Sequence, residues 1–478
     1  MIRTMLALCA AALALSAAIP ATGSLAALPP PQPSVEEQAD RVAKGDRFAW
    51  EFTEGLTTEV GPRQAGTEAE ARGREWAMNW LRRHGFRNVR SEAFTMDTWV
   101  PGDIARARIT EPFAQDLVVL PLGNSAATPA GGIEGELVYF RNVDDLRAAP
   151  ARSLEGKIAY ISHAMKPAQD GSHYGFAGPA RWVGAGIAAE KGAIATVIKS
   201  VGTDYHRNPH TGGTTFPDGV EPIPAAAMSL PDAANVERMF ARADGRQVRL
   251  RLELNPREIG RTQSGNVIAE IPGRNPDLPP VLLACHIDSW WNSPGAFDDA
   301  AGCGIIAAAA IHVQRTGAPL RTIRVLMAGA EETGLWGSKA YSAAHLDEPV
   351  AVGLESDFGA DRIWRIESNF RDSNPALHAK LAKAVARFAV ADSTVTATGG
   401  ADLDIVRDQQ GALIDLQQDG MRYFDLHHTP DDTLDKIDLA QLRQNVAVWT
   451  QVVGILANER RAILTGGVVP SAPPIMER

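Results

Sequence analysis

Histidine and carboxylate residues gather in one short stretch, Ala284 to Ala300, which reads ACHIDSWWNSPGAFDDA. The apolar residues before His286 predict a buried parallel strand that ends at the edge of a sheet, where ligands bind. Asp288 projects to the same side as His286 and can accept the proton on its other ring nitrogen. Asp298 and Asp299 follow a loop and precede an alanine-rich helix. These residues can hold a divalent metal ion, although a strand-end histidine satisfied by a neighbouring carboxylate would look the same.

Polar side chains also follow three later apolar or aromatic segments. Glu331 and Glu332 come directly after the apolar run 323–330, and Asp357 follows the run 350–354. His427 and His428 lie in a loop before the last predicted helix. Adjacent carboxylates after a buried strand are costly unless a positive group meets them. In a doubly wound sheet, these positions meet at one edge.

The mixture of imidazole and carboxylate groups predicts zinc, with manganese or cobalt as possible substitutes. The carboxylates outnumber the three protein ligands, plus a water, that one catalytic zinc needs. We therefore expect two Zn²⁺ ions about 3.5–4 Å apart, bridged by an aspartate. One glutamate of the adjacent pair can then ligate while the other acts as a general base.

The elements around these motifs indicate an α/β fold. From Ser264 onward, predicted strands alternate with helices, and the last helix spans roughly 438–460. This alternation predicts a doubly wound mixed sheet with helices on both faces. Upstream, helices are expected over 34–53 and 68–84, with capping boxes at Ser34 and Thr67.

The predicted domain organisation has an insertion. Residues 34–120 and 258–462 form two parts of the catalytic domain, and the second part carries the metal site. Residues 121–257 form a small β-rich inserted domain, whose histidines, including His210, are expected to be structural or solvated. Residues 463–478 are expected to form a loose tail.

Composition limits the class of protein. The 478 residues are 45% apolar and carry a net charge of −10, without a basic stripe, so we expect no nucleic-acid partner. Residues 1–27 resemble a secretory signal peptide whose apolar run is too short to span a membrane. We expect export to the periplasm or the extracellular space without stable membrane insertion. Cys285 and Cys303 are expected to be buried free thiols. The oligomeric state is not readable from the sequence.

The ordered motifs HID, FDD, AEE, ESD and HHTPDDTLDKID resemble the co-catalytic di-zinc aminopeptidase family, which has the zinc exopeptidase fold. The resemblance is closest to its plasma glutamate carboxypeptidase (carboxypeptidase Q) branch. The segment GPRQAGT at 61–67 belongs to the same resemblance, as does the insertion 121–257, which looks like a protease-associated domain.

The resemblance implies a role for each motif residue. It assigns one zinc to His286 and Asp357, the other zinc to Glu332 and His428, and the bridge to Asp298. It makes Glu331 the general base and Asp288 the partner that orients His286. The Asp298–Asp299 peptide is expected to be cis. His427 stands where many simple aminopeptidases have a tyrosine that binds the oxyanion, so His427 is a candidate oxyanion or substrate contact.

The function expected from these residues is an exported zinc exopeptidase that hydrolyses dipeptides or the N-terminal bond of short peptides. A basic residue near the site, Arg407 or Arg422, could instead recognise a terminal carboxylate, which would give a carboxypeptidase or strict dipeptidase. A non-catalytic binding protein that retains the fold is the alternative from another class, but such a protein would be expected to have lost ligands. Trp290 and Trp291 could line the substrate pocket or pack in the core. Asp299 and Asp432 are expected to support the ligands or cap helices.

Overall fold

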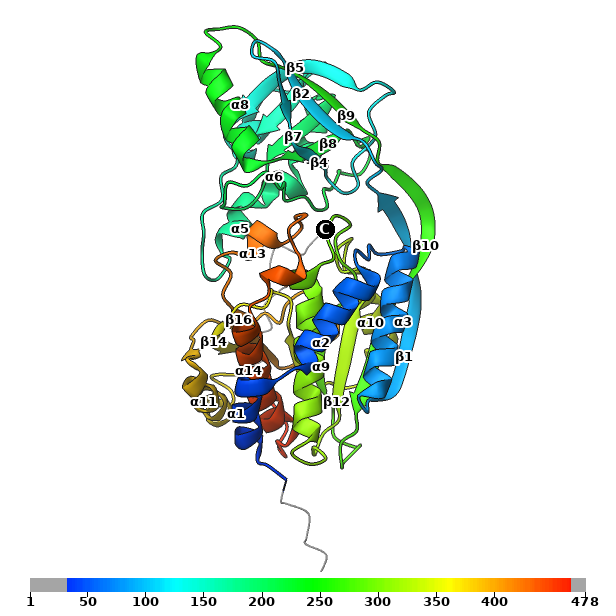
Figure 1. Ribbon diagram of the computed structural model, residues 1–478, viewed down its shortest axis with the longest axis vertical. Helices are drawn as coiled ribbons and strands as arrows, with labels where there is room; N and C mark the ends of the chain where they lie inside the picture. The colour runs from blue at the N-terminus through cyan, green and yellow to red at the C-terminus, as the bar shows by residue number, and fades with distance from the viewer. Residues whose placement is uncertain (1–31, 466–478) are drawn as a thin grey trace, which may run out of the picture. The chain divides into compact units, whose positions relative to one another are not determined.

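Two eight-stranded mixed sheets with helices packed on them make up residues 32–465, which are the residues that the computed structural model describes (Figure 1). The predicted signal peptide and the tail from residue 466 onward lie outside the described residues. The first sheet has the strand order β1 (Arg87–Val100), β10 (Arg257–Ile271), β12 (Ile323–Ala328), β11 (Val281–His286), β13 (Val352–Glu355), β16 (Leu413–Gln418), β14 (Ile363–Ser368) and β15 (Ala391–Asp392).

The four central strands of this sheet, β12, β11, β13 and β16, run parallel to one another. From β11 the chain passes through α9 (Ala301–Gln314) to β12 on one side of β11. It then passes through α10 (Trp336–His345) to β13 on the other side. The carboxyl end of β11 is therefore a topological switch point, where open α/β sheets form their ligand sites.

Helices cover both faces of the first sheet, as the sequence predicts. On one face, Leu283 packs in a core with α9, α2 (Phe48–Gly55), α3 (Glu68–Arg83), α11 (Pro375–Val385) and α14 (Leu439–Ala457). On the other face, Leu282 and Ala284 pack against α10 and α12 (Asp404–Asp408). The segment Ala296–Gln314 is apolar and long enough to cross a membrane, but it is completely buried, which is typical of a core helix.

The helix expected over 34–53 is instead two helices, α1 (Val35–Gly45) and α2. The capping box of Ser34 and Glu37 is present at the start of α1. Asp46 follows α1 in an extended conformation, and its carboxylate accepts hydrogen bonds from the backbone amides of Phe48 and Ala49, at 3.2 Å each. The apolar periodicity continues through this break, because both helices bury the same side of the chain.

The second sheet has the strand order β3 (Gln115–Leu117), β2 (Ala105–Glu111), β9 (Arg249–Leu254), β5 (Ile133–Phe140), β6 (Ile158–Ile161), β7 (Ala195–Lys199), β8 (Ala225–Met228) and β4 (Val119–Pro121). Its helices are α4 (Val143–Ala148), α5 (His173–Ala177), α6 (Pro179–Trp182), α7 (Gly184–Glu190) and α8 (Leu230–Arg242). We call residues 105–254 the second lobe. It includes β2, β3 and β4, which the sequence analysis places before the insertion, because β2 pairs with the distant strand β9. The domain boundaries at 120/121 and 257/258 stay a prediction.

The expectation of two free thiols is wrong. Cys285 near the end of β11 and Cys303 in the first turn of α9 form a disulfide, with their Cα atoms 5.3 Å apart. The low number of cysteines excludes a scaffold built on many disulfides. It does not exclude a single bridge between a strand and the helix that packs on it.

Candidate metal centre

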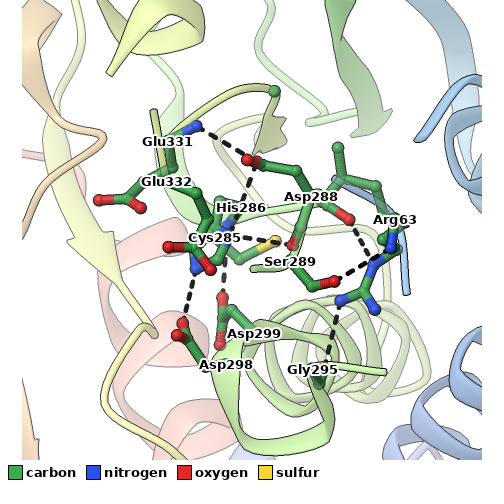
Figure 2. Close-up of polar contacts among 12 residues, drawn as sticks. Arg63, Cys285, His286, Asp288, Ser289, Gly295, Asp298, Asp299, Glu331 and Glu332 are labelled. Carbon is green, nitrogen blue, oxygen red and sulfur yellow. Dashed lines mark hydrogen bonds and ion pairs between the residues drawn. The ribbon is translucent and has the colours of Figure 1, made fainter. Parts of the chain in front are cut away.

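The five predicted ligands come together at the carboxyl edge of the central strands. His286 ends β11, Asp298 lies between β11 and α9, Glu332 follows β12, and Asp357 follows β13. His428 follows α13 (Tyr423–Leu426), which comes after β16. Figure 2 shows several of these side chains around the end of β11. The switch-point topology thus brings together residues that are up to 142 positions apart in sequence.

Asp298 belongs to two separate groups of potential ligands. Its Oδ1 lies 2.9 Å from Nε2 of His286, which is also 3.4 Å from Oδ1 of Asp357. Its Oδ2 lies 3.4 Å from Nε2 of His428, which is 2.5 Å from Oε2 of Glu332. Within each group of three side chains, one ligand atom per residue lies within 4.8 Å of the others. Each group is therefore compact enough to surround one ion, and Asp298 joins the two.

Several oxygen atoms of this cluster lack a hydrogen-bond partner. Among the described residues, these buried atoms include Oδ2 of Asp298, Oε1 of Glu332 and Oδ1 of Asp357. Burial, together with the charge of Asp298, raises the pKa of Glu332 well above its usual range. Buried carboxylates without a positive partner are unfavourable, and a divalent cation would supply that charge. The donor atoms, one imidazole and two carboxylates per group, fit zinc.

Glu331 and Asp288 lie beside the ligands and belong to neither group. The backbone N–H of Glu331 donates to Oδ1 of Asp288 at 3.2 Å, as Figure 2 shows. The same Oδ1 is 3.7 Å from Nδ1 of His286, whereas the backbone oxygen of Asp288 is only 3.2 Å from that nitrogen. The carboxylate of Asp288 therefore lies near the His286 ring, but the backbone oxygen makes the shorter contact. Burial, with a contribution from the Asp357 carboxylate, raises the pKa of Glu331 well above its usual range.

Arg63 explains why the segment GPRQAGT lies next to this site. Its side chain is completely buried, and its guanidinium donates to the backbone oxygens of Ile287 (2.6 Å), Pro294 and Gly295 (3.2 Å). The backbone N–H of Arg63 also donates to the hydroxyl of Ser289 at 3.1 Å. Arg63 thereby holds the loop between His286 and Asp298 (Figure 2).

Asp299 and Asp432 support the backbone around Asp298. The Asp298–Asp299 peptide is cis, as expected. Asp299 accepts hydrogen bonds from the amides of His286 (3.3 Å) and Gly302 (3.1 Å), so it links the end of β11 to the start of α9. Asp432 accepts from the amides of Phe297 (2.6 Å) and Asp298 (3.1 Å).

The second lobe contributes residues to this site that the sequence analysis did not assign to it. His210 is fully buried, and its ring centroid lies 4.9 Å from that of His427 and 5.4 Å from that of His428. The backbone oxygen of Thr211 lies 3.1 Å from Nδ1 of His428. His210 was expected to be structural or solvated; it is buried, and it packs against His427 and His428, which the sequence did not indicate. The Gly212–Gly213 pair after it was the available signal, because a Cβ at Gly212 would clash with Arg181 and His428.

His427 lies within the cluster, as expected for a candidate contact residue. Its Nε2 is 3.5 Å from Oδ2 of Asp298, and its ring stacks on His428 with a centroid distance of 3.8 Å. Burial, together with the neighbouring His428, lowers the pKa of His427 well below its usual range. Trp290 stacks on the same His428 ring, with centroids 5.0 Å apart, so it packs against a predicted ligand.

The two arginines considered as carboxylate receptors are already paired. Arg407 forms an ion pair with Asp404 at 2.6 Å and donates to the backbone oxygens of Gly400 and Ala401. Arg422 forms a bidentate pair with Asp361, at 2.6 and 2.7 Å. The sequence could not reveal the second pair, since Asp361 lies 61 residues from Arg422.

Comparison with known proteins identifies relatives that match most of the chain. The family model described as Peptidase family M28 matches residues 266–453. Carboxypeptidase Q of Mus musculus is 30% identical over 409 residues, which cover 84% of each protein. The crystal structure of a Peptidase M28 precursor from Shewanella amazonensis SB2B is 40% identical and has a TM-score of 0.85, covering 92% of this chain and 99% of that one. The zinc aminopeptidase BSAP from Bacillus subtilis shares the fold, with a TM-score of 0.60 and 20% identity over 86% of this chain and 94% of its own.

The fold, the cluster of histidines and carboxylates, and these relatives define the chain as a zinc metallopeptidase. The chain belongs to Peptidase family M28, which confirms the expected family and the expected mixed α/β fold.

Proposed function

We propose that this protein is an exported exopeptidase that uses two zinc ions to hydrolyse dipeptides or the N-terminal bond of short peptides. The observation that carries the proposal is the position of Asp298, whose two carboxylate oxygens face two different histidines. One carboxylate shared between two three-residue groups is the geometry of a bridged two-metal site. His286 and Asp357 would hold one ion, and Glu332 and His428 the other, with manganese or cobalt as possible substitutes.

The zinc ions, when bound, would polarise the scissile carbonyl and make the attacking water more acidic. Glu331 would accept a proton from that water and then donate it to the nitrogen of the leaving amine. Its position beside both groups, without membership in either, leaves its carboxylate free for this transfer. Asp288 would position Glu331 through the backbone hydrogen bond between them. His427, next to Asp298, would donate a hydrogen bond to the developing oxyanion.

The names of the relatives support a peptide substrate. The alignment with carboxypeptidase Q covers 84% of this chain and 84% of that protein, so the similarity extends over both sheets. The excess of carboxylates around the site favours a substrate with a positively charged end, such as a free α-amine. Export is proposed from residues 1–27, which carry the features of a signal peptide.

Hydrolysis of a panel of dipeptides with free, N-acetylated and C-amidated ends, measured together with the metal content, tests this proposal. The expected result is hydrolysis of the free dipeptides, loss of activity with the N-acetylated ones, and close to two zinc ions per chain. A chelator should abolish the activity, and zinc should restore it. A metal-replete protein that hydrolyses none of the free dipeptides and no longer peptide would refute the proposal.

A further inference from the structure

Arg181 of the second lobe lies next to the metal centre and has no carboxylate partner within the part of the chain that the structure describes. Its Nη1 is 3.2 Å from Nδ1 of the predicted ligand His428, 3.0 Å from Nε2 of His210 and 3.2 Å from the backbone oxygen of Thr211. None of the ion pairs found among residues 32–465 involves Arg181. The side chain is nevertheless 92% buried, since its relative exposure is 8%.

The other buried arginines show how unusual this environment is within the chain. Arg63 donates through Nε, Nη1 and Nη2 to three backbone oxygens. Arg321 likewise donates through all three nitrogens, to the backbone oxygens of Glu459, Pro279 and Arg461. By contrast, the polar contacts of Arg181 all involve Nη1, and its buried Nε has no partner among the described residues.

A buried guanidinium with unused donors is unfavourable unless an anion completes its hydrogen bonds. Its planar donor geometry matches a carboxylate, which it can bind through two parallel hydrogen bonds. The substrate of an exopeptidase supplies such an anion when its carboxyl end lies close to the scissile bond. Arg407 and Arg422 cannot fill this role without breaking their own ion pairs.

The segment that carries Arg181 is fixed to the segment that carries His428. Tyr174, just before α6, stacks on Phe424 of α13 with a centroid distance of 4.1 Å and an interplanar angle of 21°. On the same side, Asp425 accepts a hydrogen bond from the hydroxyl of Thr203 at 2.8 Å. These contacts fix the backbone around Arg181 relative to the segment that carries His428.

We propose that Arg181 is the residue that recognises the free α-carboxylate of the substrate, so that the second lobe determines a preference for dipeptides over longer or amidated peptides. This inference rests on the proposed exopeptidase function and adds the residue that reads the carboxyl end. In a dipeptide, the carboxylate belongs to the leaving residue and lies one residue from the scissile carbonyl.

The test compares alanyl-alanine with alanyl-alaninamide, which share the scissile bond and differ in the terminal charge. The wild-type enzyme should prefer the free acid by about 10- to 100-fold in kcat/KM, the range for a charge-assisted hydrogen bond. Arg181→Met should lower kcat/KM for the acid by that factor, chiefly through KM, and leave the amide within about twofold. Arg147→Met is the matched control, because Arg147 is exposed on α4 of the same lobe and pairs with Asp144.

Zinc content and thermal unfolding of each variant provide readouts that do not depend on turnover. If Arg181 only holds His428 in place, Arg181→Met would lose zinc or lower kcat for both substrates equally, and the inference would be overturned. If Arg181→Met does not fold, Arg181→Gln provides a milder change that should also remove the preference for the acid. If either variant folds, binds zinc and keeps the wild-type ratio of kcat/KM for the acid to kcat/KM for the amide, the inference is overturned, but the proposed function is not. Failure of the zinc-loaded wild type to hydrolyse these two compounds, the other free dipeptides and longer peptides would refute the proposed function as well.

Discussion

The adjacent glutamates Glu331 and Glu332 allow a matched test of the two-metal mechanism. Each is replaced by glutamine, a change of the same size and the same charge at neighbouring positions. Oε2 of Glu332 lies 2.5 Å from Nε2 of His428, within one of the two ligand groups, whereas Glu331 belongs to neither group. The same chemical change should therefore affect metal binding at one position and proton transfer at the other.

For Glu331→Gln, we expect kcat to fall by about 10²- to 10⁴-fold, the usual contribution of a general base. That range corresponds to about 3–5 kcal/mol of transition-state free energy. The hydrogen bond to Asp288 comes from the backbone N–H of residue 331, so it survives the substitution, and the zinc content should not change. For Glu332→Gln, one of the three proposed ligands of one proposed ion is lost, and the affinity for that ion should fall by about 100-fold.

The assay combines steady-state hydrolysis of alanyl-alanine with zinc analysis after dialysis against a weak chelator. Added zinc should restore part of the activity of Glu332→Gln, because saturation compensates for lower affinity. It should not restore Glu331→Gln. The reasoning is refuted if Glu331→Gln retains wild-type kcat, or if both variants lose zinc to the same extent.

Three further outcomes follow from buried groups around the site. Arg63→Met should destabilise the protein by roughly 3–6 kcal/mol in urea unfolding, because three buried backbone oxygens lose a charged donor; a loss below 1 kcal/mol would contradict this. Burial, which outweighs the attraction of Arg74, raises the pKa of Glu70 to about 7. The folded state therefore binds this proton more tightly than the unfolded state, and stability should fall by about 3 kcal/mol as pH rises from about 4.5 to 7. In urea unfolding at pH 5 and pH 8, the free energy of unfolding of Glu70→Gln should fall less between the two pH values than that of the wild type. An identical fall in both proteins would show that Glu70 does not cause it. Peptide mapping of the unreduced protein should find Cys285 linked to Cys303. Because the bridge joins residues 18 positions apart, Cys303→Ala should lower the free energy of unfolding by about 3 kcal/mol. Recovery of both cysteines as free thiols would show that the bridge does not form.

The sequence was informative wherever the relevant signal is local. The apolar runs that end at His286 and before Glu331 identify buried strands, because a strand covered on both faces needs apolar residues throughout. A polar residue directly after such a run must lie at the carboxyl edge of the sheet. The structure has β11 and β12 at these positions, and it gathers the five predicted ligands there.

Local signals were weaker where two patterns overlap. Asp46 ends one helix and caps the next, but the apolar spacing continues across it, so a single helix was predicted. The pairing of Cys285 with Cys303 depends on how α9 packs on β11, which no local pattern records.

The sequence by itself determined the fold class, the family and the order of the candidate ligands, since His286, Glu332 and Asp357 lie at or shortly after the end of an apolar strand. Only the tertiary structure decided which residues of the second lobe reach the metal centre. Arg181 and His210 come from segments more than 200 residues before His428. Their approach depends on contacts between the two lobes, such as the stacking of Tyr174 on Phe424. The tertiary structure also showed that Arg422 is already paired with Asp361. Asp361 and Arg422 are 61 residues apart in sequence, and only folding brings them together, so no local pattern reveals this pair.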